Sequence, residues 1–570
     1  MKNSVKLAFV SLCAILLVSC NDDFLKRDPY GNTITQEQYS QTANQLEGSM
    51  RGIYSILTSY VYTGDGHDEF GRRSLDMYTD LLSGDMALTD YKYGWFYSDE
   101  RGLSNTGRTG FIWTYFYSML RNVNSILRTV KSNPDNVINR IAANGLPNEY
   151  NSKKDVYYNI VAGDTLATYT ADEAQVASYY AQALAFRGYI YSELLMLYCQ
   201  TPRHINSFKQ ERCFPMYNED NMESAQPLAT MAEVYTQLEG DLINAIDYFE
   251  AFSEYKRNSK IEVDAAIANG ILAYSYLNKG NPTQPGVSEY TEAYTNARDY
   301  ALKAIQAANE NGIHILPNNS LTTTGFNDVS NESWMWGENV TVETTSMLNS
   351  WWGQCDIHSY SYAWLGDTKA IDENLYKLIA AADSTKDGKP NGHPFDARIN
   401  WFNDGSSNPI YKLCADGKYY SAKNPTSTKA DDIDREWLSD NVLMRIEMMY
   451  LIAAEASYRL GNKNDAITYL TDITSKRVLT GHEAQYGDYE LSLSNGTANL
   501  LDEIEYNWRV ELWGEGYSLM TFRRLSPDVT TERKRGANHK GSPGSKMTED
   551  DKYIFVMPSN EGSYNPNVND

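Results

Sequence analysis

The sequence lacks the residue arrangements on which most catalytic and metal centres depend. Its 570 residues include only seven histidines, at positions 67, 204, 314, 358, 393, 482 and 539. These are too far apart to place two zinc ligands on neighbouring turns of one helix. Nucleophile-elbow spacing and a phosphate-binding glycine loop are also missing. We therefore expect no enzyme, no cofactor and no metal site. The segment 65–69 (DGHDE) could hold calcium, but an ordinary surface turn fits it better.

Positive charge is scarce. The chain carries 50 Lys and Arg against 74 Asp and Glu, a formal net charge of −24. Such a surface repels phosphate backbones, so nucleic acid is not an expected partner. With so many carboxylates, a pair spaced like that of a glycoside hydrolase always occurs by chance. A lipid-anchored hydrolase therefore stays open as an alternative, without a motif that favours it.

Cysteine is also rare, and no CxxC pair occurs among the six cysteines. Cys199 and Cys213 would close a loop worth about 3 kcal/mol of stability if they were bonded. The sequence leaves open whether they form a disulfide or, like Cys355 and Cys414, remain thiols.

Long hydrophobic runs are absent beyond the N-terminal segment. Lys2 and Lys6 precede an apolar run, Leu7 to Val18, that is too short to span a bilayer. We expect residues 1–19 to be a signal peptide. The segment Leu17-Val18-Ser19-Cys20 resembles a bacterial lipobox, which implies that Cys20 is acylated and becomes the new N-terminus. An ordinary signal with a chance cysteine is the alternative.

Helical periodicity is what the sequence does contain. Apolar and small residues recur at helical spacing in 181–198, 265–277 and 443–458. Each segment is followed by an alanine-rich partner, at 234–246, 293–304 and 465–470. Such helical hairpins resemble tetratricopeptide repeats, although they are irregular and far apart. The intervening regions, roughly 60–110, 310–440 and 525–570, are rich in Gly, Asn, Ser, Tyr and Trp, which is typical of loops. We predict a mainly α fold: irregular tetratricopeptide-like hairpins as a scaffold, long loop-rich insertions and little β structure.

Several phrases occur in the order typical of one family. They are "IWTYFYSMLRNVNSIL" (112–127), "ALAFRGYIYSELLMLY" (183–198), "ATMAEVYTQLEGDLINAI" (229–246), "SNESWMW" (330–336), "LMRIEMMYLIAAEASYRLGNKNDAITYL" (443–470), "EIEYNWRVELWGEGYSLMTFRRL" (503–525) and the close "YIFVMPSNEGSYNPN". With the lipobox, they are similar to the SusD/RagB family of outer-membrane nutrient-binding lipoproteins. Departures occur at 506–509, which lacks the usual Glu-Arg pair, and at Tyr517, where the family often has Arg.

The resemblance implies a partner and a place in the cell. The partner would be a SusC-like TonB-dependent transporter, to which the protein delivers an oligosaccharide or oligopeptide. The protein would be held on the outer membrane by its lipid anchor, and the acidic pair Asp22-Asp23 resembles the signal that sends some lipoproteins to the outer face. We expect an N-terminal helical region at 20–320 and a C-terminal region with ligand loops at 321–570, together forming one body.

Two aromatic clusters in the loop regions suit ligand capture. A sugar offers an apolar ring face and a rim of hydroxyls, so its site needs flat rings and polar rim groups. Both clusters lie where the family's ligand loops are expected, although each ring could instead pack into the body. The first cluster is Tyr91, Tyr93, Trp95 and Tyr97, and the second is Trp351, Trp352, Tyr360, Tyr362 and Trp364. Arg72, Asp80 and Asp85 are candidate rim groups, whereas Trp334 and Trp336 are expected in the core.

A structural or adhesive surface lipoprotein is the third class that the sequence allows, since it would share the lipobox, the acidity and the aromatic residues. Copurification with a transporter would favour nutrient delivery, and saccharide turnover would favour a hydrolase. Neither result would favour adhesion.

Overall fold

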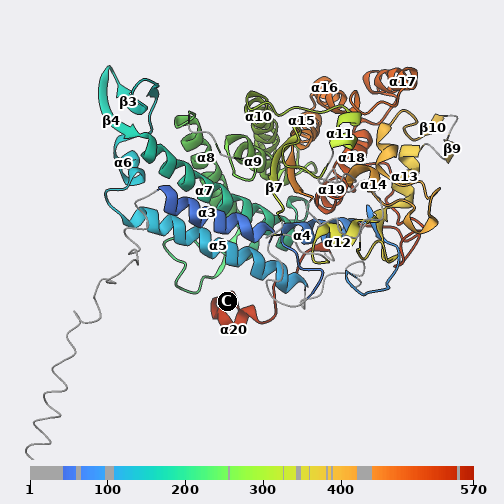
Figure 1. Cartoon of the computed structure of the whole chain (residues 1–570), viewed down its shortest axis with the longest axis horizontal. Helices are drawn as coiled ribbons and strands as arrows, with labels where there is room; N and C mark the ends of the chain where they lie inside the picture. Colours follow the sequence, from blue (N-terminus) through green and yellow to red (C-terminus); the bar gives the residue numbers. More distant parts are fainter. Residues whose placement is uncertain are drawn as a thin grey trace, which may run out of the picture.

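The computed structural model describes residues 43–58, 66–96, 108–254, 257, 259–324, 326–341, 344, 348–358, 360–380, 383–386, 389–419, 439–548 and 553–569. The signal segment, Cys20, Asp65 and Tyr97 lie outside these residues. The fold is mainly helical with a few small sheets, which confirms the predicted class (Figure 1).

Helices make up about half of the described chain. They are α3 (Ala43–Thr58), α4 (Arg72–Ser83), α5 (Arg108–Ser132), α6 (Val137–Asn144), α7 (Ala171–Tyr198), α8 (Met231–Ala251), α9 (Ala265–Lys279), α10 (Ser288–Glu310), α11 (Asn318–Thr324), α12 (Trp351–Cys355), α13 (Glu373–Ala380), α14 (Asp416–Tyr419), α15 (Ile446–Arg459), α16 (Lys463–Thr474), α17 (Glu483–Ser494), α18 (Leu500–Glu511), α19 (Ser518–Leu525) and α20 (Glu561–Tyr564), with short 3-10 turns η3 (Pro202–His204), η4 (Ala397–Trp401), η5 (Pro409–Tyr411) and η7 (Pro566–Asn569).

The strands are short and pair antiparallel. They are β1 (Met86–Leu88), β2 (Glu149–Asn151), β3 (Val156–Val161), β4 (Asp164–Thr170), β5 (Arg212–Pro215), β6 (Leu228–Thr230), β7 (Trp334–Glu338), β8 (Lys369–Ile371), β9 (Asp383–Lys386), β10 (Lys389–Asn391) and β11 (Asn441–Arg445). The order β2-β3-β4 forms a three-stranded sheet, and the pairs β1-β8, β5-β6, β7-β11 and β9-β10 form two-stranded sheets.

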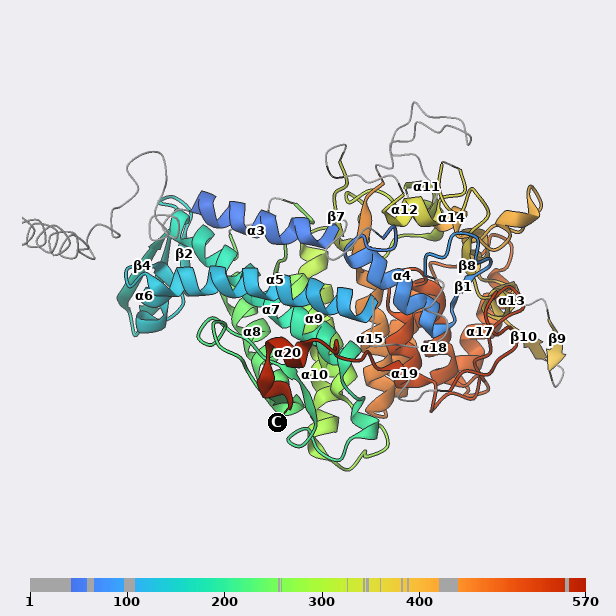
Figure 2. The ribbon, with the colours of Figure 1, turned by 90° about the horizontal axis from the view of Figure 1, so that it is seen from below.

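The three predicted hairpins form the scaffold. Helix α7 packs on α8, α9 on α10, and α15 on α16, while α10 also packs on α15 and thereby joins the second hairpin to the third. Figure 1 shows α8, α9, α10, α15 and α16 following one another across the molecule, and Figure 2 shows α3, α5 and α7 running side by side. Among the described residues, no helix combines the length and the apolar character needed to cross a membrane.

Helix α7 is the central element of the N-terminal half. The Thr170 hydroxyl accepts a hydrogen bond from the Glu173 backbone N–H, and the Glu173 carboxylate accepts one from the Thr170 backbone N–H, which together form a capping box. From residue 176 to residue 198 every side chain is buried. A helix that is buried on all sides needs partners all round, and α3, α5, α8 and α9 supply them.

Two glycines allow close contacts between helices and their neighbours. A Cβ at Gly188 of α7 would lie 2.6 Å from Cγ of Leu242 in α8, and a Cβ at Gly270 of α9 would lie 2.9 Å from Sδ of Met444. These glycines therefore set the separation between neighbouring elements.

Three features of the fold differ from what the sequence predicts. The predicted helix 443–458 begins only at Ile446, because residues Asn441–Arg445 pair with β7 as strand β11. The predicted loop 60–110 contains helix α4, whose twelve residues are all buried. The sheet β2-β3-β4, at the left end of the molecule in Figure 1, was not predicted.

The four cysteines of the described chain are free thiols. Cys199 and Cys414 are buried, and Cys213 and Cys355 are half-buried. Burial, together with the neighbouring Cys213, raises the pKa of the Cys199 thiol well above its usual value. The question that the sequence left open for Cys199 and Cys213 is thus answered in favour of thiols.

We expect Gly188→Ala to destabilise the protein relative to the matched control Gly240→Ala. At Gly188 the new methyl group meets Leu242, and overpacking of this kind costs about 1–3 kcal/mol. At Gly240, within α8, nothing lies within 4 Å of the added Cβ, so the better helix propensity of alanine should stabilise by up to about 1 kcal/mol. Chemical denaturation measures both values, and equal unfolding free energies would contradict the proposed contact.

Candidate functional site

One strand pairing brings the two predicted aromatic clusters together. Strand β1 pairs antiparallel with β8, with Leu88 opposite Lys369, and the Thr89 backbone N–H extends this pairing by donating to the Thr368 carbonyl at 3.1 Å. The first cluster follows β1 and the second precedes β8. Because the strands are antiparallel, the two loops emerge side by side. Lys92 Nζ then joins them by donating to the carbonyl of Leu365 at 2.5 Å.

The rings of the two loops contact one another. The centroids of Tyr93 and Tyr362 lie 5.0 Å apart in an edge-to-face arrangement, and those of Trp95 and Tyr362 lie 6.3 Å apart. His67 stacks on Trp95 at 5.1 Å, and its Nδ1 shares a hydrogen bond of 2.5 Å with the Tyr362 hydroxyl. Tyr362 is buried and Trp95 is half-buried, so they form the base on which the outer rings rest.

Four large apolar side chains remain exposed above this base. Their exposed fractions are 41% for Tyr93, 38% for Tyr360, 43% for Trp364 and 60% for Ile410. We call these four residues the aromatic patch. The ring centroids of Tyr360 and Trp364 lie 6.1 Å apart. The loop that carries Ile410 is attached to this surface, because the Tyr411 hydroxyl donates to the Trp364 carbonyl at 3.0 Å.

Ile410 was not among the site residues predicted from the sequence. The available signal was an isolated isoleucine in the polar segment Gly405-Ser406-Ser407-Asn408-Pro409, where no core pattern requires it. An exposed apolar residue beside exposed rings enlarges a surface that can cover the apolar face of a ligand.

Trp351 and Trp352 belong to the interior instead. The Trp351 ring lies under the guanidinium of Arg73 at 4.0 Å and is 1% exposed. Trp352 is also buried, and its Nε1 donates to the Ser439 carbonyl at 2.9 Å. The expectation that these two rings face a ligand gives way to a structural role, because each ring is buried and already has a partner within the chain. Tyr91 is half-buried and packs against the main core.

The three expected rim groups are buried as well. Arg72 pairs with Asp76 and Glu193, both at 2.8 Å, and donates to the Tyr189 hydroxyl at 2.6 Å. Asp80 accepts a hydrogen bond of 2.8 Å from the Gly514 backbone N–H. Burial and the nearby carboxylates of Asp76 and Asp85 raise the pKa of Asp80 to about 8.

Asp85 accepts hydrogen bonds from Arg509 Nε at 2.9 Å and Nη2 at 2.8 Å, and it also faces Arg533 at 3.4 Å. Arg72, Asp80 and Asp85 therefore bind other parts of the chain and do not belong to the candidate surface. Trp334 and Trp336 are confirmed as core residues.

A small cleft lies between α12 and the segment around Asp416. It has a volume of about 20 Å³, and Asp356, His358 and Asp416 are among the residues that line it. That volume holds about one water molecule. Asp68, from the possible calcium turn, pairs with Arg108. Within the described ranges, no group of three or more His, Cys, Asp or Glu side chains is arranged to hold a metal ion.

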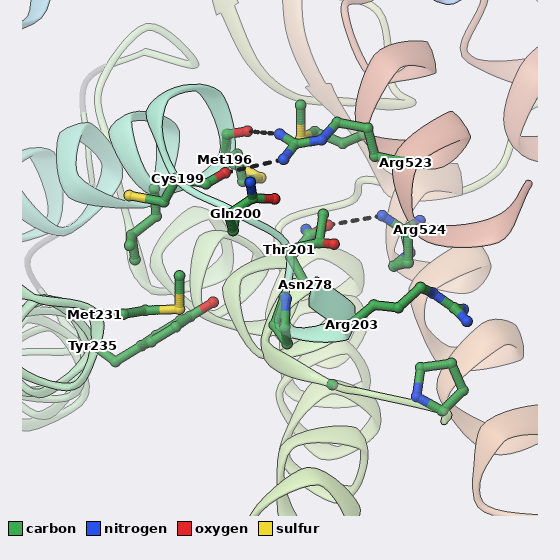
Figure 3. A pocket seen from close by; sticks show the side chains of 15 residues that line it. Met196, Cys199, Gln200, Thr201, Arg203, Met231, Tyr235, Asn278, Arg523 and Arg524 are labelled. Carbon is green, nitrogen blue, oxygen red and sulfur yellow. Dashed lines mark hydrogen bonds between the residues drawn. The ribbon is translucent and has the colours of Figure 1, made fainter. Parts of the chain in front are cut away.

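A second hollow lies where α7, α8, α9 and α19 meet (Figure 3). Met196, Met231 and Met520 contribute to its mainly apolar lining, and its volume is about 40 Å³. Its guanidinium groups are already engaged. Arg523 donates to the carbonyls of Met196 at 2.5 Å and Cys199 at 3.0 Å, and Arg524 donates to Asn278 at 2.9 Å (Figure 3). This hollow is therefore too small and too apolar for a saccharide.

Together, these features describe a helical scaffold that presents loop-borne aromatic residues on one surface. The SusD family model matches residues 216–568, and the chain therefore belongs to the SusD family. No curated protein matches the sequence.

Several solved structures share the fold at low identity. A SusD-like carbohydrate binding protein from Bacteroides vulgatus is 20% identical with a TM-score of 0.62, covering 92% of this chain and 97% of that one. A SusD superfamily protein from Bacteroides thetaiotaomicron is 18% identical with a TM-score of 0.61, covering 92% and 99%. A SusD homolog from the same species is 14% identical with a TM-score of 0.58, covering 92% and 97%.

Replacing Trp351 or Trp364 by alanine should show which of the two rings belongs to the core and which to the surface. We expect Trp351→Ala to lower the free energy of unfolding by about 3–5 kcal/mol, because it empties a buried site beneath Arg73. Trp364→Ala removes a ring that is 43% exposed, so its loss should be much smaller. Urea denaturation of both variants measures the difference. Similar losses for the two would show that the assignment of surface and core is mistaken.

Proposed function

We propose that the protein captures an oligosaccharide or oligopeptide on the aromatic patch and delivers it to a SusC-like TonB-dependent transporter. Lipid on Cys20 would hold it at the outer membrane, facing the cell exterior. Membership of the SusD family supports the nutrient-binding role and the choice of transporter.

The observation that carries the proposal is the group of large rings left exposed on a fixed base. Tyr93 leans on Tyr362, and Tyr362 is held by the hydroxyl contact with His67. Flat rings stack on the C–H face of a sugar or on a peptide side chain, and a preformed surface loses little freedom on binding. Exposed apolar area of this kind is otherwise unfavourable in water.

A saccharide is the preferred ligand class. One of the similar solved structures is described as a carbohydrate binding protein. The apolar patch also has polar groups nearby, since Lys92 is exposed and Asp90 is half-buried. Hydroxyls at the rim of a sugar could hydrogen-bond to such groups while its ring stacks on Trp364 or Tyr360.

The glycoside hydrolase remains a second candidate because two carboxylates, Asp356 and Asp416, line the same cleft. A cleft of about 20 Å³ excludes a sugar ring, which argues against bond cleavage there. Saccharide turnover by the purified protein would reverse this preference. Adhesion, the third class, has no specific observation in its favour.

Binding to glycan and peptide arrays should depend on the aromatic patch. Each stacked ring contributes on the order of 1 kcal/mol beyond its burial, so the double variant Tyr360→Ala/Trp364→Ala should lose roughly tenfold or more in affinity. The control Tyr564→Ala removes a ring that is 81% exposed on α20, outside the patch, and should bind like the wild type. Undiminished binding by the double variant would place the ligand elsewhere.

Replacement of Cys20 should release the protein from membranes. Two or more buried acyl chains give stable attachment, and Cys20→Ala removes the residue that would carry them. We expect the variant in the soluble fraction after cell lysis and the wild type in the outer-membrane fraction. If the variant still sediments with outer membranes in the absence of the transporter, the lipid anchor is ruled out as the cause of attachment.

A further inference from the structure

Two cysteines from different elements lie in contact at the end of α7. Cys199 follows the last residue of that helix, and its backbone N–H donates to the Leu195 carbonyl at 3.2 Å. Cys213 lies in strand β5. The two thiols share a side-chain hydrogen bond, although a long loop separates them in the sequence. The fold therefore brings together two sulfur nucleophiles that the function proposed above does not use.

The backbone is fixed on both sides of this contact. Strand β5 pairs with β6, and the Glu211 carbonyl just before β5 accepts a hydrogen bond of 2.8 Å from the backbone N–H of Met231. On the other side, Arg523 Nη2 donates to the Cys199 carbonyl at 3.0 Å. The approach of Cys213 to Cys199 is therefore set by the fold.

The two thiols differ in their access to solvent. Cys199 is 3% exposed, whereas Cys213 is half-buried. A dissolved oxidant therefore reaches Cys213 first. Burial and the neighbouring Cys213 raise the pKa of the Cys199 thiol, and the guanidinium of Arg523 partly offsets this effect by favouring the thiolate. Cys199 is thus suited to the second step of an exchange, in which it reacts only with the sulfur beside it.

The other two cysteines of the described chain provide an internal comparison. Burial raises the pKa of the Cys355 thiol to about 12, so little of it is the reactive thiolate at neutral pH. Cys414 is 1% exposed, burial raises the pKa of its thiol as well, and its side chain hydrogen-bonds to Thr368. We expect an oxidant to leave both of these thiols unchanged.

We propose that Cys199 and Cys213 form a redox-sensitive clamp, which a small disulfide in solution closes by converting the two thiols into an intramolecular disulfide. The structure shows the reduced form. In the first step the Cys213 thiolate attacks the small disulfide, so that a mixed disulfide forms and one small thiol leaves. The Cys199 thiolate then attacks the Cys213 sulfur and displaces the second small thiol. Two electrons pass from the cysteine pair to the small disulfide, and the two cysteine protons end on the released thiols.

The closed clamp would restrain a junction between several helices. Within the loop 199–213, Arg203 pairs at 2.6 Å with Asp528, which follows α19. The Pro202 carbonyl accepts a hydrogen bond of 2.8 Å from Nδ2 of Asn281, which follows α9. A covalent link across this loop restricts the unfolded chain, so the oxidised protein should resist unfolding better than the reduced one.

The clamp goes beyond the proposed function, although export would favour its closure. The signal segment predicted from the sequence would take the chain out of the cytoplasm, and disulfides form and persist in such compartments. The exchange itself needs only the two thiols and a small disulfide, so it can be tested on the purified protein.

The test uses oxidised glutathione on the chain from position 20 carrying Cys20→Ala, so that the cysteines at 199, 213, 355 and 414 are the ones present. The protein is incubated with the oxidant, alkylated in denaturant and mapped by mass spectrometry. We expect linked peptides carrying Cys199 and Cys213, no bound glutathione, and alkylation at Cys355 and Cys414. A reductant should restore all four thiols.

Single substitutions separate the two steps. Cys199→Ser should hold one glutathione on Cys213, because no second thiol displaces it. Cys213→Ser should take up little or no glutathione, because the remaining partner is buried. Cys355→Ser is the matched control and should form the clamp as the unsubstituted pair does.

Thermal melting measures the clamp directly. The oxidised protein should melt a few degrees above the reduced protein, because the disulfide restricts the unfolded chain. Cys199→Ser/Cys213→Ser should melt at one temperature with or without the oxidant. The comparison of oxidised with reduced protein requires no substitution at either cysteine, so it holds even where a variant fails to fold.

The proposal is overturned if all four thiols stay free after oxidation, or if glutathione remains on Cys213 while Cys199 is present. A link between Cys355 and Cys414 instead, or an unchanged melting temperature after oxidation, would overturn it as well. The reaction needs neither a ligand nor a transporter, so failure of the proposed function would leave each of these results unchanged.

Discussion

A buried carboxylate, that of Glu511, holds the C-terminal half of the molecule together. It accepts hydrogen bonds from Arg445 at 2.9 Å, from Arg477 at 2.8 and 3.0 Å and from Arg398 at 3.2 Å, and all four side chains are buried. Burial alone opposes ionisation, but Arg477 and Arg445 overcome it and lower the pKa of Glu511 well below its usual value. Removing one partner of such a network costs about 3–5 kcal/mol, because a charge is left without compensation. The network therefore fixes β11, η4, α18 and the turn after α16 in a single arrangement.

A second buried carboxylate, that of Asp85, fixes the segment that leads to the aromatic patch. Asp85 follows α4 and precedes β1, and its pairing with Arg509 fastens that segment to α18. Once β1 is fixed, its pairing with β8 fixes the two loops that carry the patch. The exposed rings thus rest on elements whose positions are set by charges in the interior. A ligand that stacks on them meets a surface already in place, so little of the binding free energy is spent on ordering loops.

The periodic part of the fold could be predicted from the sequence, because small and apolar residues at helical spacing report local geometry. The hairpins α7/α8, α9/α10 and α15/α16 follow that pattern. Helix α4 does not follow this pattern, because Arg72, Asp76 and Asp80 are buried in it. In the sequence such charged residues suggest a solvent-exposed face, and only their distant partners explain their burial. The start of α15 was misplaced for a related reason. Residues just before Ile446 pair with β7, a partner more than a hundred positions away, and no local pattern reports such a pairing.

The sequence showed which loops are rich in aromatic residues, but it did not show which of these residues are exposed. Trp351 and Trp364 stand in similar polar surroundings in the sequence, yet Arg73 covers the first ring and nothing comparable covers the second within the described chain. Whether such a ring is exposed therefore depends on which distant side chain packs over it. This cannot be inferred from a single sequence. The meeting of the two clusters depends in the same way on the register between Leu88 and Lys369. A shift of that register by one residue would turn the neighbouring side chains to the opposite face and separate Tyr93 from Tyr362. The candidate binding surface is thus a consequence of long-range strand pairing, and the buried ion pairs are what hold that pairing in place.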